Sequence, residues 1–325
     1  MILNINPGIS VGDFVFGDDI NSILKIIDNF DHVPSFTVNF NEAEPDKIVI
    51  NLVDLGFCLV FKAATQQFER FVLLDTSSST NIRISGKMIA GVSANVSVSS
   101  ITNCLGPTFP PSLHEIENKA HIKYPGVTIF FDSTNLPLSN SVNACLMWFE
   151  PLQPLTLPSV SFKFQDGVLS HNGVVIEMGT KTDYIVGILG DPSQVFRPPK
   201  QQYTAFNDVS GTHPCNMWLN YNEIGVDFGF KGDQLDKVVF HTNSPDDLLF
   251  GRYNRCFFSL QIGNAVLYPH TRPNLRKEPV EYEECVFDAN IILGKRFFYN
   301  FDRVSVELTR GGNVRTIIIF KQGAK

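Results

Sequence analysis

The sequence lacks the short motifs that mark several large classes of enzyme. It contains no P-loop for nucleotide phosphates, no GxGxxG dinucleotide fingerprint and no HExxH zinc motif. Its 6 cysteines include no CxxC pair and are scattered along the chain, so they suggest neither a zinc framework nor a disulfide scaffold. The sequence therefore predicts a protein that is not an enzyme and that uses no cofactor and no metal.

A basic leader, a long apolar run and a strong excess of one charge are also missing. The net charge is −7, from 26 basic and 33 acidic residues without a basic stripe, which argues against nucleic acid as a direct partner. No apolar run approaches the length of a membrane-spanning helix. Residues 1–11 contain no Lys or Arg and are broken by Pro7-Gly8, unlike a secretory signal. These absences predict a reduced, cytoplasmic protein.

The length and the aromatic content favour a large protein rich in sheets. At 325 residues the chain exceeds the usual size of one domain, so two lobes or one elongated array of repeats is expected. Phenylalanine is abundant, with 28 residues against 2 tryptophans, and aromatic side chains suit the pleated surface of a sheet. The hydrophobic fraction of 43% is ample for a core.

One pattern recurs in fixed order: an apolar helix that ends in Leu-Gly, a proline close behind, and a later strand headed by Gly-Val. The pattern contains Gly106, Pro107 and Gly126, and then Gly190, Pro192 and Gly225. A glycine after the last apolar position can take the left-handed conformation that ends a helix, and proline prevents continuation. Recurrence of this kind predicts copies of one supersecondary unit, with these residues in structural positions.

Four helix–hairpin units can be traced. The first begins with Ile20, Ile23 and Ile27 on one helical face. The fourth is degenerate, and its weak helix is expected to end at Leu293-Gly294. The predicted fold class is α+β and β-rich, with tandem helix–β-hairpin repeats, antiparallel sheets and short helices packed on one side.

A Pro-rich stretch at about 150–160 is the expected boundary between two lobes. Residues 1–155 would form an N-terminal lobe with units 1 and 2. Residues 156–325 would form a C-terminal lobe with units 3 and 4.

The clearest strand in the sequence is 226–231. Val226, Phe228 and Phe230 are expected to face the core, and Asp227 and Lys231 to face the other side. This alternation predicts an antiparallel strand with only one face buried.

The most specific pattern lies in the C-terminal lobe. It comprises Pro214-Cys215-Asn216, Asn220-Tyr221, Gly225-Val226-Asp227, His241-Thr242-Asn243-Ser244-Pro245 and Tyr253-Asn254-Arg255-Cys256. Together with Leu105-Gly106-Pro107 and Leu189-Gly190-Asp191-Pro192 upstream, it resembles a eukaryotic family of phagophore-assembly (autophagy) regulators, long catalogued as an uncharacterised protein family. The resemblance covers roughly residues 12–260, and the fourth unit matches only in outline.

The resemblance implies a non-enzymatic autophagy regulator. It would be an interaction module that acts with a β-propeller protein of the autophagy machinery, where autophagosomes form. Association with membranes would be indirect, through that partner, and the protein would be recruited from the cytoplasm to the phagophore assembly site. The family brings no catalytic residues that can be placed on this sequence, and any property it owes to its C-terminal unit is not implied here.

The candidate partner-binding residues are Tyr253, Arg255, His241 and Asn243. Tyr and Arg often anchor interfaces, and loops placed by a rigid sheet often carry binding sites. We therefore expect Tyr253 and Arg255 to contribute to a protein interface, while His241 and Asn243 hold their loop in shape. The alternative is turn chemistry alone, because Asn243 can bond its own backbone and Pro245 ends the strand.

Two other function classes remain open at this stage. A concave, Phe-rich sheet would suit a protein that binds or transfers lipid or another apolar ligand. An enzyme is the third class, but no constellation of residues supports it. A metal site drawn from His213, Cys215, His241 and Cys256 has no recognised spacing, so these residues are interpreted as ordinary thiols and histidines.

Overall fold

The chain folds into two units in the computed structural model, Met1–Leu157 and Pro158–Lys325. The sequence predicts a boundary after residue 155, and the observed division follows Leu157. The residues that the structure describes are 1–40, 46–76, 80–91, 96–114, 117–139, 142–156, 158–198, 215–245, 247, 249–271, 273, 280–286, 291–309 and 312–321.

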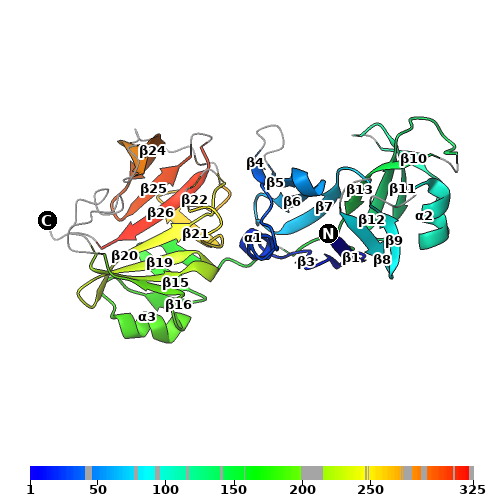
Figure 1. Ribbon diagram of the computed structural model, residues 1–325. Coiled ribbons are helices and arrows are strands. Elements are labelled where there is room, and N and C mark those ends of the chain that lie inside the picture. Colours follow the sequence, from blue (N-terminus) through cyan, green and yellow to red (C-terminus); the bar gives the residue numbers. More distant parts are fainter. Residues whose placement is uncertain are drawn as a thin grey trace. The chain divides into compact units, whose positions relative to one another are not determined.

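The N-terminal unit contains a five-stranded and an eight-stranded sheet (Figure 1). The smaller sheet has the order β3 (Phe14–Val15), β2 (Ser10–Val11), β1 (Ile2–Asn6), β8 (Asn81–Ile84), β9 (Lys87–Ala90). The larger sheet has the order β10 (Ser112–Leu113), β11 (Ala120–Tyr124), β12 (Val127–Phe131), β13 (Ala144–Phe149), β7 (Phe68–Leu73), β6 (Phe57–Lys62), β5 (Lys47–Leu52), β4 (Thr37–Phe40). Its helices are α1 (Ile20–Asp28), α2 (Val98–Leu105) and a 3-10 turn, Val53–Leu55.

The C-terminal unit has the same two kinds of sheet. Its smaller sheet has the order β16 (Val174–Ile176), β15 (Val168–His171), β14 (Phe162–Gln165), β21 (Phe258–Ile262), β22 (Ala265–Leu267). Its larger sheet has the order β17 (Gln194–Phe196), β18 (Met217–Tyr221), β19 (Val226–Lys231), β20 (Gln234–His241), β26 (Val314–Phe320), β25 (Val304–Leu308), β24 (Ile291–Asn300), β23 (Val280–Val286). Its helices are α3 (Thr182–Leu189) and a 3-10 turn, Asn222–Ile224. The prediction of a β-rich fold with few short helices is confirmed.

Both large sheets are built from two four-stranded meanders whose last strands pair in the middle of the sheet. In the N-terminal unit β7 pairs with β13, and in the C-terminal unit β20 pairs with β26, antiparallel in both cases. The small sheets each contain one parallel pair, β1 with β8 and β14 with β21, where the sequence leads us to expect antiparallel sheets only. Parallel neighbours need a long crossover, and the helix and meander between the paired strands provide it.

The glycines of the recurring pattern have matching geometry. Gly106 and Gly190 end α2 and α3 with φ of 90° and 80°. Their carbonyl oxygens accept hydrogen bonds from the hydroxyls of Tyr124 and Tyr221, at 2.9 and 3.0 Å. Each tyrosine thus joins its helix to the neighbouring strand. The interpretation of these elements as tandem repeats stays a prediction.

Gly126 and Gly225 lie immediately before β12 and β19, with φ of 72° and 67°. A side chain is strained in this left-handed region, so glycine suits both positions. Pro107 and Pro192 follow the two helix ends, where the missing amide proton of proline costs nothing.

The first helix forms as its sequence predicts. Oδ1 of Asp19 accepts hydrogen bonds from the backbone N–H groups of Asn21 and Ser22, which caps the helix. Ile20, Ile23 and Ile27 are buried on one face, so the helix is held mainly by this apolar contact.

The fourth helix predicted from the sequence is wrong. Leu293-Gly294 lies inside β24, which pairs with β23 and β25. The residues before Gly294 are β-branched or apolar, and they suit a strand as well as a helix in so short a run. Pairing with β23 at Ile291, Ile292 and Gly294 decides the conformation.

The core of the C-terminal unit lies between the inner face of the large sheet and a layer made by the small sheet and α3 (Figure 1). Val226, Phe228 and Phe230 are fully buried there, as the sequence predicts. The prediction that only one face of this strand is covered is wrong, because Asp227 on the outer face is also buried, with 7% of its surface exposed. Residues from the connection after β20 lie over that outer face and provide part of the cover.

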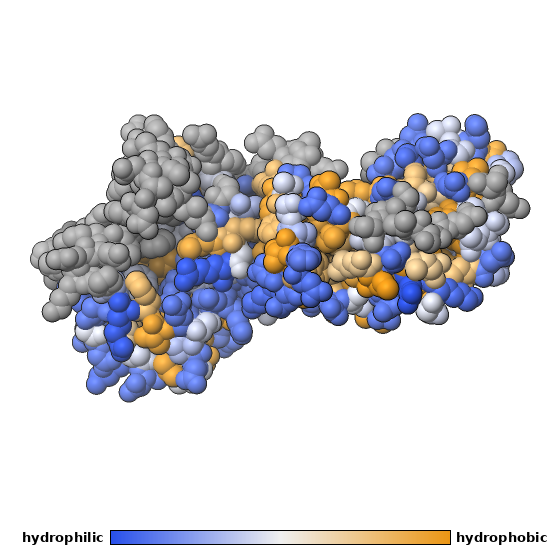
Figure 2. Space-filling view, in the orientation of Figure 1, coloured by the Kyte–Doolittle hydropathy of each residue, from blue (hydrophilic) through white to orange (hydrophobic). Residues whose placement is uncertain are grey.

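The described surface in view mixes hydrophilic and hydrophobic residues (Figure 2). On the small sheet of the C-terminal unit, Val174 and Val175 of β16 remain exposed. Within the described residues, each helix is too short or too polar to cross a membrane.

Candidate binding site on the outer face of the C-terminal sheet

The floor of the candidate site is one row of residues across four neighbouring strands. In register, Gln194 of β17 pairs with Asn220 of β18, Asn220 with Asp227 of β19, and Asp227 with Val239 of β20. Residues that are directly opposite in a sheet point to the same face, about 5 Å apart at Cβ. The side chains of this row therefore stand side by side on the outer face of the sheet.

One wall is formed by described residues of the connection that joins β20 to β21, which are 242–245, 247 and 249–257. The hydroxyl of Thr242 lies 2.9 and 2.8 Å from the carbonyl oxygens of Val314 and Arg315, to which it donates. Farther along, the Arg315 guanidinium donates to Oδ2 of Asp247 at 3.0 Å. Both contacts tie the connection to β26, so the wall is fixed to the sheet at two points.

Asn243 and Arg255 shape the same connection. Asn243 has a φ of 51°, and its Oδ1 accepts the backbone N–H of Gly251 at 2.9 Å. Asparagine tolerates this left-handed conformation better than most residues do. Nε of Arg255 donates to the carbonyl oxygen of Thr242 at 2.9 Å. Burial lowers the pKa of the Arg255 guanidinium to about 10.

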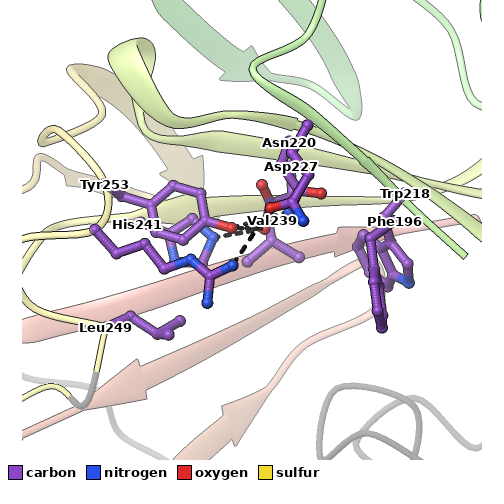
Figure 3. Close-up of a pocket in the computed structure, with 10 residues that line it drawn as sticks. Phe196, Trp218, Asn220, Asp227, Val239, His241, Leu249 and Tyr253 are labelled. Carbon is purple, nitrogen blue, oxygen red and sulfur yellow. Dashed lines mark hydrogen bonds and ion pairs between the residues drawn. The ribbon is translucent and has the colours of Figure 1, made fainter. Parts of the chain in front are cut away.

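Asp227 is the centre of a hydrogen-bond network (Figure 3). Its Oδ2 accepts from Nε2 of His241 at 2.9 Å and from the hydroxyl of Tyr253 at 3.0 Å. The Tyr253 oxygen in turn accepts from Nδ2 of Asn220 at 2.9 Å. The rings of His241 and Tyr253 are stacked, with centroids 3.9 Å apart and planes inclined by 15°. The network thus joins β18, β19, β20 and the connection after β20.

Two side-chain oxygens at the centre of the network accept no hydrogen bond from the described residues. They are Oδ1 of Asp227 and Oδ1 of Asn220, and both are buried. Most buried polar atoms in proteins are hydrogen-bonded, and each exception needs an explanation. The site therefore holds two adjacent, unused acceptors, one of them on a carboxylate.

A cavity of about 240 Å³ opens over this row. Phe196 and Trp218 lie on one side of it, and His241, Tyr253 and Leu249 lie on the other (Figure 3). A Cβ on Gly229 would lie 2.8 Å from the indole of Trp218. The bare backbone of β19 at Gly229 thus makes room for that ring.

Burial keeps the hydroxyl of Tyr253 in its neutral form. It raises the pKa of the Tyr253 hydroxyl, and the nearby Asp227 carboxylate raises it further. The hydroxyl therefore stays protonated and acts as a hydrogen-bond donor to that carboxylate. No other group in the described part of the network is placed as a nucleophile, so the arrangement suits binding better than catalysis.

The string Gly8-Ile9-Ser10-Val11-Gly12 has the GxSxG form that marks a hydrolase nucleophile when it joins a strand to a helix. Ser10 instead lies within β2, and its hydroxyl accepts a hydrogen bond from Nδ2 of Asn6 at 3.0 Å. The required strand–turn–helix geometry is absent at Ser10.

Metal ligands do not converge in the described residues, where no group of three His, Cys, Asp or Glu side chains is placed to hold an ion. Cys58, Cys104, Cys145, Cys215 and Cys256 are free thiols. His213, which the sequence adds to a conceivable metal set, lies outside the described residues.

The structure brings two of the four residues proposed from the sequence into contact, and the other two bond to the backbone of the connection. His241 and Tyr253 contact each other and line the cavity, and Asn243 holds the fold of the connection. Arg255 bonds to the backbone of the same connection. Tyr253 is only 4% exposed, so a partner would meet little of its side chain.

Sequence reasoning missed Asp227, Asn220 and Trp218. Asp227 appears in the sequence as the solvent-facing member of an alternating strand. The signal that could have revealed it is an acid inside an otherwise apolar strand, in the same distinctive stretch as His241 and Tyr253.

Comparison with known proteins gives a match along most of the chain. The family model described as Phagosome assembly factor 1 matches residues 10–161 and 159–284. A PHAF1 protein of Arabidopsis thaliana is 22% identical over an alignment of 390 residues, which covers 98% of this chain and 93% of the relative. A PHAF1 protein of Caenorhabditis elegans is 27% identical over 170 residues, covering 46% of this chain and 39% of the relative. No solved structure matches.

Proposed function

This chain belongs to the phagosome assembly factor 1 family, and from that membership we propose that it is a non-enzymatic, autophagy-related assembly factor. The observation that carries the proposal is the family match, which spans both structural units. The outer-face site supports it, because an unreactive network beside a cavity is suited to recognition. The protein acts by binding other components rather than by transforming a substrate.

Its principal partner in this proposal is a β-propeller protein of the autophagy machinery. The protein works as a scaffold in the cytoplasm and joins that partner at the phagophore assembly site. Its contact with membranes is indirect and passes through the partner. This assignment derives from the resemblance of the C-terminal stretch that contains His241, Asn243, Tyr253 and Arg255.

The surface that meets the partner is the mouth of the outer-face cavity. His241, Asn243, Tyr253 and Arg255 hold the connection in place through the contacts described above. Phe196, which lines the same cavity and is exposed, then makes the direct contact. Aromatic side chains are common anchors of interfaces.

Affinity purification of the tagged full-length chain from its own cells tests the partner assignment. We expect a β-propeller protein among the co-purifying proteins and expect the Phe196→Ala variant to lose it. Phe109→Ala is the matched control, because Phe109 is an exposed Phe of the N-terminal unit, at 86%. Retention of the propeller by the folded Phe196→Ala variant would move the interface elsewhere, and absence of the propeller from the wild-type purification would reject the partner.

The role in autophagy is tested separately by deleting the gene and measuring autophagic flux with and without lysosomal inhibition. We expect reduced flux that returns when the wild-type chain is restored. Unchanged flux in the deletion strain, under conditions that induce autophagy, would contradict the assignment.

The alternative of a lipid-binding protein has less support. It needs an open, Phe-lined surface, but Phe162, Phe228, Phe230 and Phe240 of the C-terminal unit are fully buried in the core. Mass spectrometry of the purified native protein distinguishes the two functions. Stoichiometric co-purifying lipid would favour the carrier.

A further inference from the structure

Two buried acceptor oxygens on the outer face of the sheet, on Asn220 and Asp227, lack a hydrogen-bond donor among the described residues. Asn220 and Asp227 are opposite each other in register, so their side chains emerge together from neighbouring strands. Oδ1 of each residue is buried without a donor. A buried acceptor that has given up water and gained no partner destabilises the protein, so an occupant that donates to both oxygens would be favoured.

We propose that this cavity binds the guanidinium group of an arginine side chain presented by a partner protein. A guanidinium carries a permanent positive charge and five N–H donors in one plane. It can therefore donate to two separate acceptors at once, and its charge complements the Asp227 carboxylate. Nε2 of His241 and the Tyr253 hydroxyl already saturate Oδ2 of that carboxylate, which leaves Oδ1 for the ligand.

The walls of the cavity suit the rest of an arginine side chain. Trp218 and Phe196 present aromatic rings on one side, and a guanidinium stacks on such rings more readily than an ammonium does. Val239 and Leu249 supply aliphatic surface for the methylene stem. The cavity volume of about 240 Å³ is of the size of one large side chain rather than of a cofactor.

A ligand reaches the two oxygens through the mouth of the cavity, past two side chains at its rim. Gln194 and Arg252 are exposed, and Nη2 of Arg252 donates to Oε1 of Gln194 at the long distance of 3.4 Å. These flexible side chains can separate without disturbing the core. Arg252 is also a cation at the mouth of the cavity, so it repels an incoming guanidinium.

The claim that a partner protein supplies the arginine rests on the proposed function. The claim that the cavity binds a guanidinium rests on the chemistry of the site alone, and a soluble ligand tests it without any partner. A failure of ligand binding would leave the co-purification result unaffected, and the reverse also holds.

The test uses the purified full-length chain and N-acetyl-arginine methylamide, in which arginine is blocked as it is within a polypeptide. Binding is followed by NMR at the Trp218 indole and the Asn220 amide. We expect saturable shifts with a Kd of about 1 mM, which is reasonable for a single side chain. N-acetyl-citrulline methylamide is the matched neutral ligand, and we expect it to bind at least about tenfold more weakly because it lacks the charge.

Two variants change the affinity in opposite directions. Asp227→Asn keeps the shape and one acceptor for Tyr253 and His241 but removes the charge, so we expect about tenfold weaker binding of the arginine ligand. Arg252→Ala removes the repelling cation from the exposed rim, so we expect about two- to fivefold tighter binding. If Asp227→Asn does not fold, the citrulline comparison and Arg252→Ala still decide the matter.

Three outcomes would overturn the proposal. The first is the absence of arginine binding at concentrations well above the expected Kd, and the second is equal binding of arginine and citrulline. The third separates the possible sources of the guanidinium. If agmatine, a free alkyl guanidinium, binds about a hundredfold more tightly than blocked arginine, the occupant is a small metabolite rather than a side chain.

Discussion

Asp227 and Phe228 are neighbours on β19, and their side chains project from opposite faces of the sheet. Phe228 points into the core and is fully buried. Asp227 points outward and collects donors from His241 and Tyr253. The strand alternation places them apart, so a change at either residue has a separate consequence.

Phe228→Ala should lower the free energy of unfolding of the C-terminal unit by about 3–5 kcal/mol, the usual cost of truncating a buried Phe. Urea denaturation followed by circular dichroism measures it. Phe109→Ala is the control and should be nearly neutral, because Phe109 is 86% exposed. A neutral result at Phe228 would mean that this face is not the core.

The buried thiols make stability depend on alkaline pH. Burial raises the pKa of Cys215 to about 12 and that of Cys58 to about 11. The unfolded chain loses these protons near its ordinary thiol pKa, about 8.5, while the folded chain still holds them. Their stabilising contribution is therefore complete below that pH and is lost as pH rises toward 11–12.

Cys215→Ser tests this contribution. Between pH 9 and pH 11 the wild-type free energy of unfolding should fall more steeply than that of the variant, by up to about 1.4 kcal/mol per pH unit. Denaturation curves across this range give both slopes. Equal slopes would show that the Cys215 thiol ionises as readily in the folded chain as in the unfolded one.

At the scale of the element, two glycines of α3 have different roles, because Gly187 lies within the helix and Gly190 ends it. Gly187 is exposed in the helix and nothing surrounds the position that a Cβ would occupy. Gly190 ends the helix with φ of 80° and ψ of −166°, a conformation nearly restricted to glycine. Its carbonyl also receives the Tyr221 hydroxyl.

Gly187→Ala should stabilise the C-terminal unit by about 0.5–1 kcal/mol, because alanine loses less backbone entropy in a helix. Gly190→Ala should destabilise it by about 1–3 kcal/mol through backbone strain. Thermal denaturation of the two variants gives the comparison. The same sign for both changes would contradict the assigned helix end.

At the scale of the molecule, each unit has its own pair of sheets. None of the sheets exchanges strands between Met1–Leu157 and Pro158–Lys325 among the described residues. The C-terminal core consists only of residues from its own unit. Each unit thus has the internal contacts that an independent domain requires.

The polypeptides 1–157 and 158–325 should therefore each fold alone, with cooperative melting and a β-rich far-UV circular dichroism spectrum. In the full chain, Phe228→Ala should lower the melting temperature of the C-terminal unit and leave the N-terminal transition in place. Hydrogen exchange resolved by unit distinguishes the two. An unfolded isolated unit would show that its stability depends on the other.

Elements with a strong local signal follow from the amino-acid sequence alone. Asp19 caps α1, the apolar spacing of Ile20, Ile23 and Ile27 selects its buried face, and the alternation in 226–231 fixes which residues reach the core. These features depend on interactions a few residues apart. The family resemblance of the distinctive stretch in the C-terminal lobe likewise resides in the sequence alone.

The contacts between distant segments depend on the tertiary fold. Residues 291–294 became strand because they pair with β23, a tertiary gain that a short apolar run does not encode. Asp227 became a buried centre because strand register places it beside Asn220 and the chain after β20 brings Tyr253 over it. Pairing across 26 residues, between Asp227 and Tyr253, leaves no local period in the sequence, so the site could be recognised only in three dimensions.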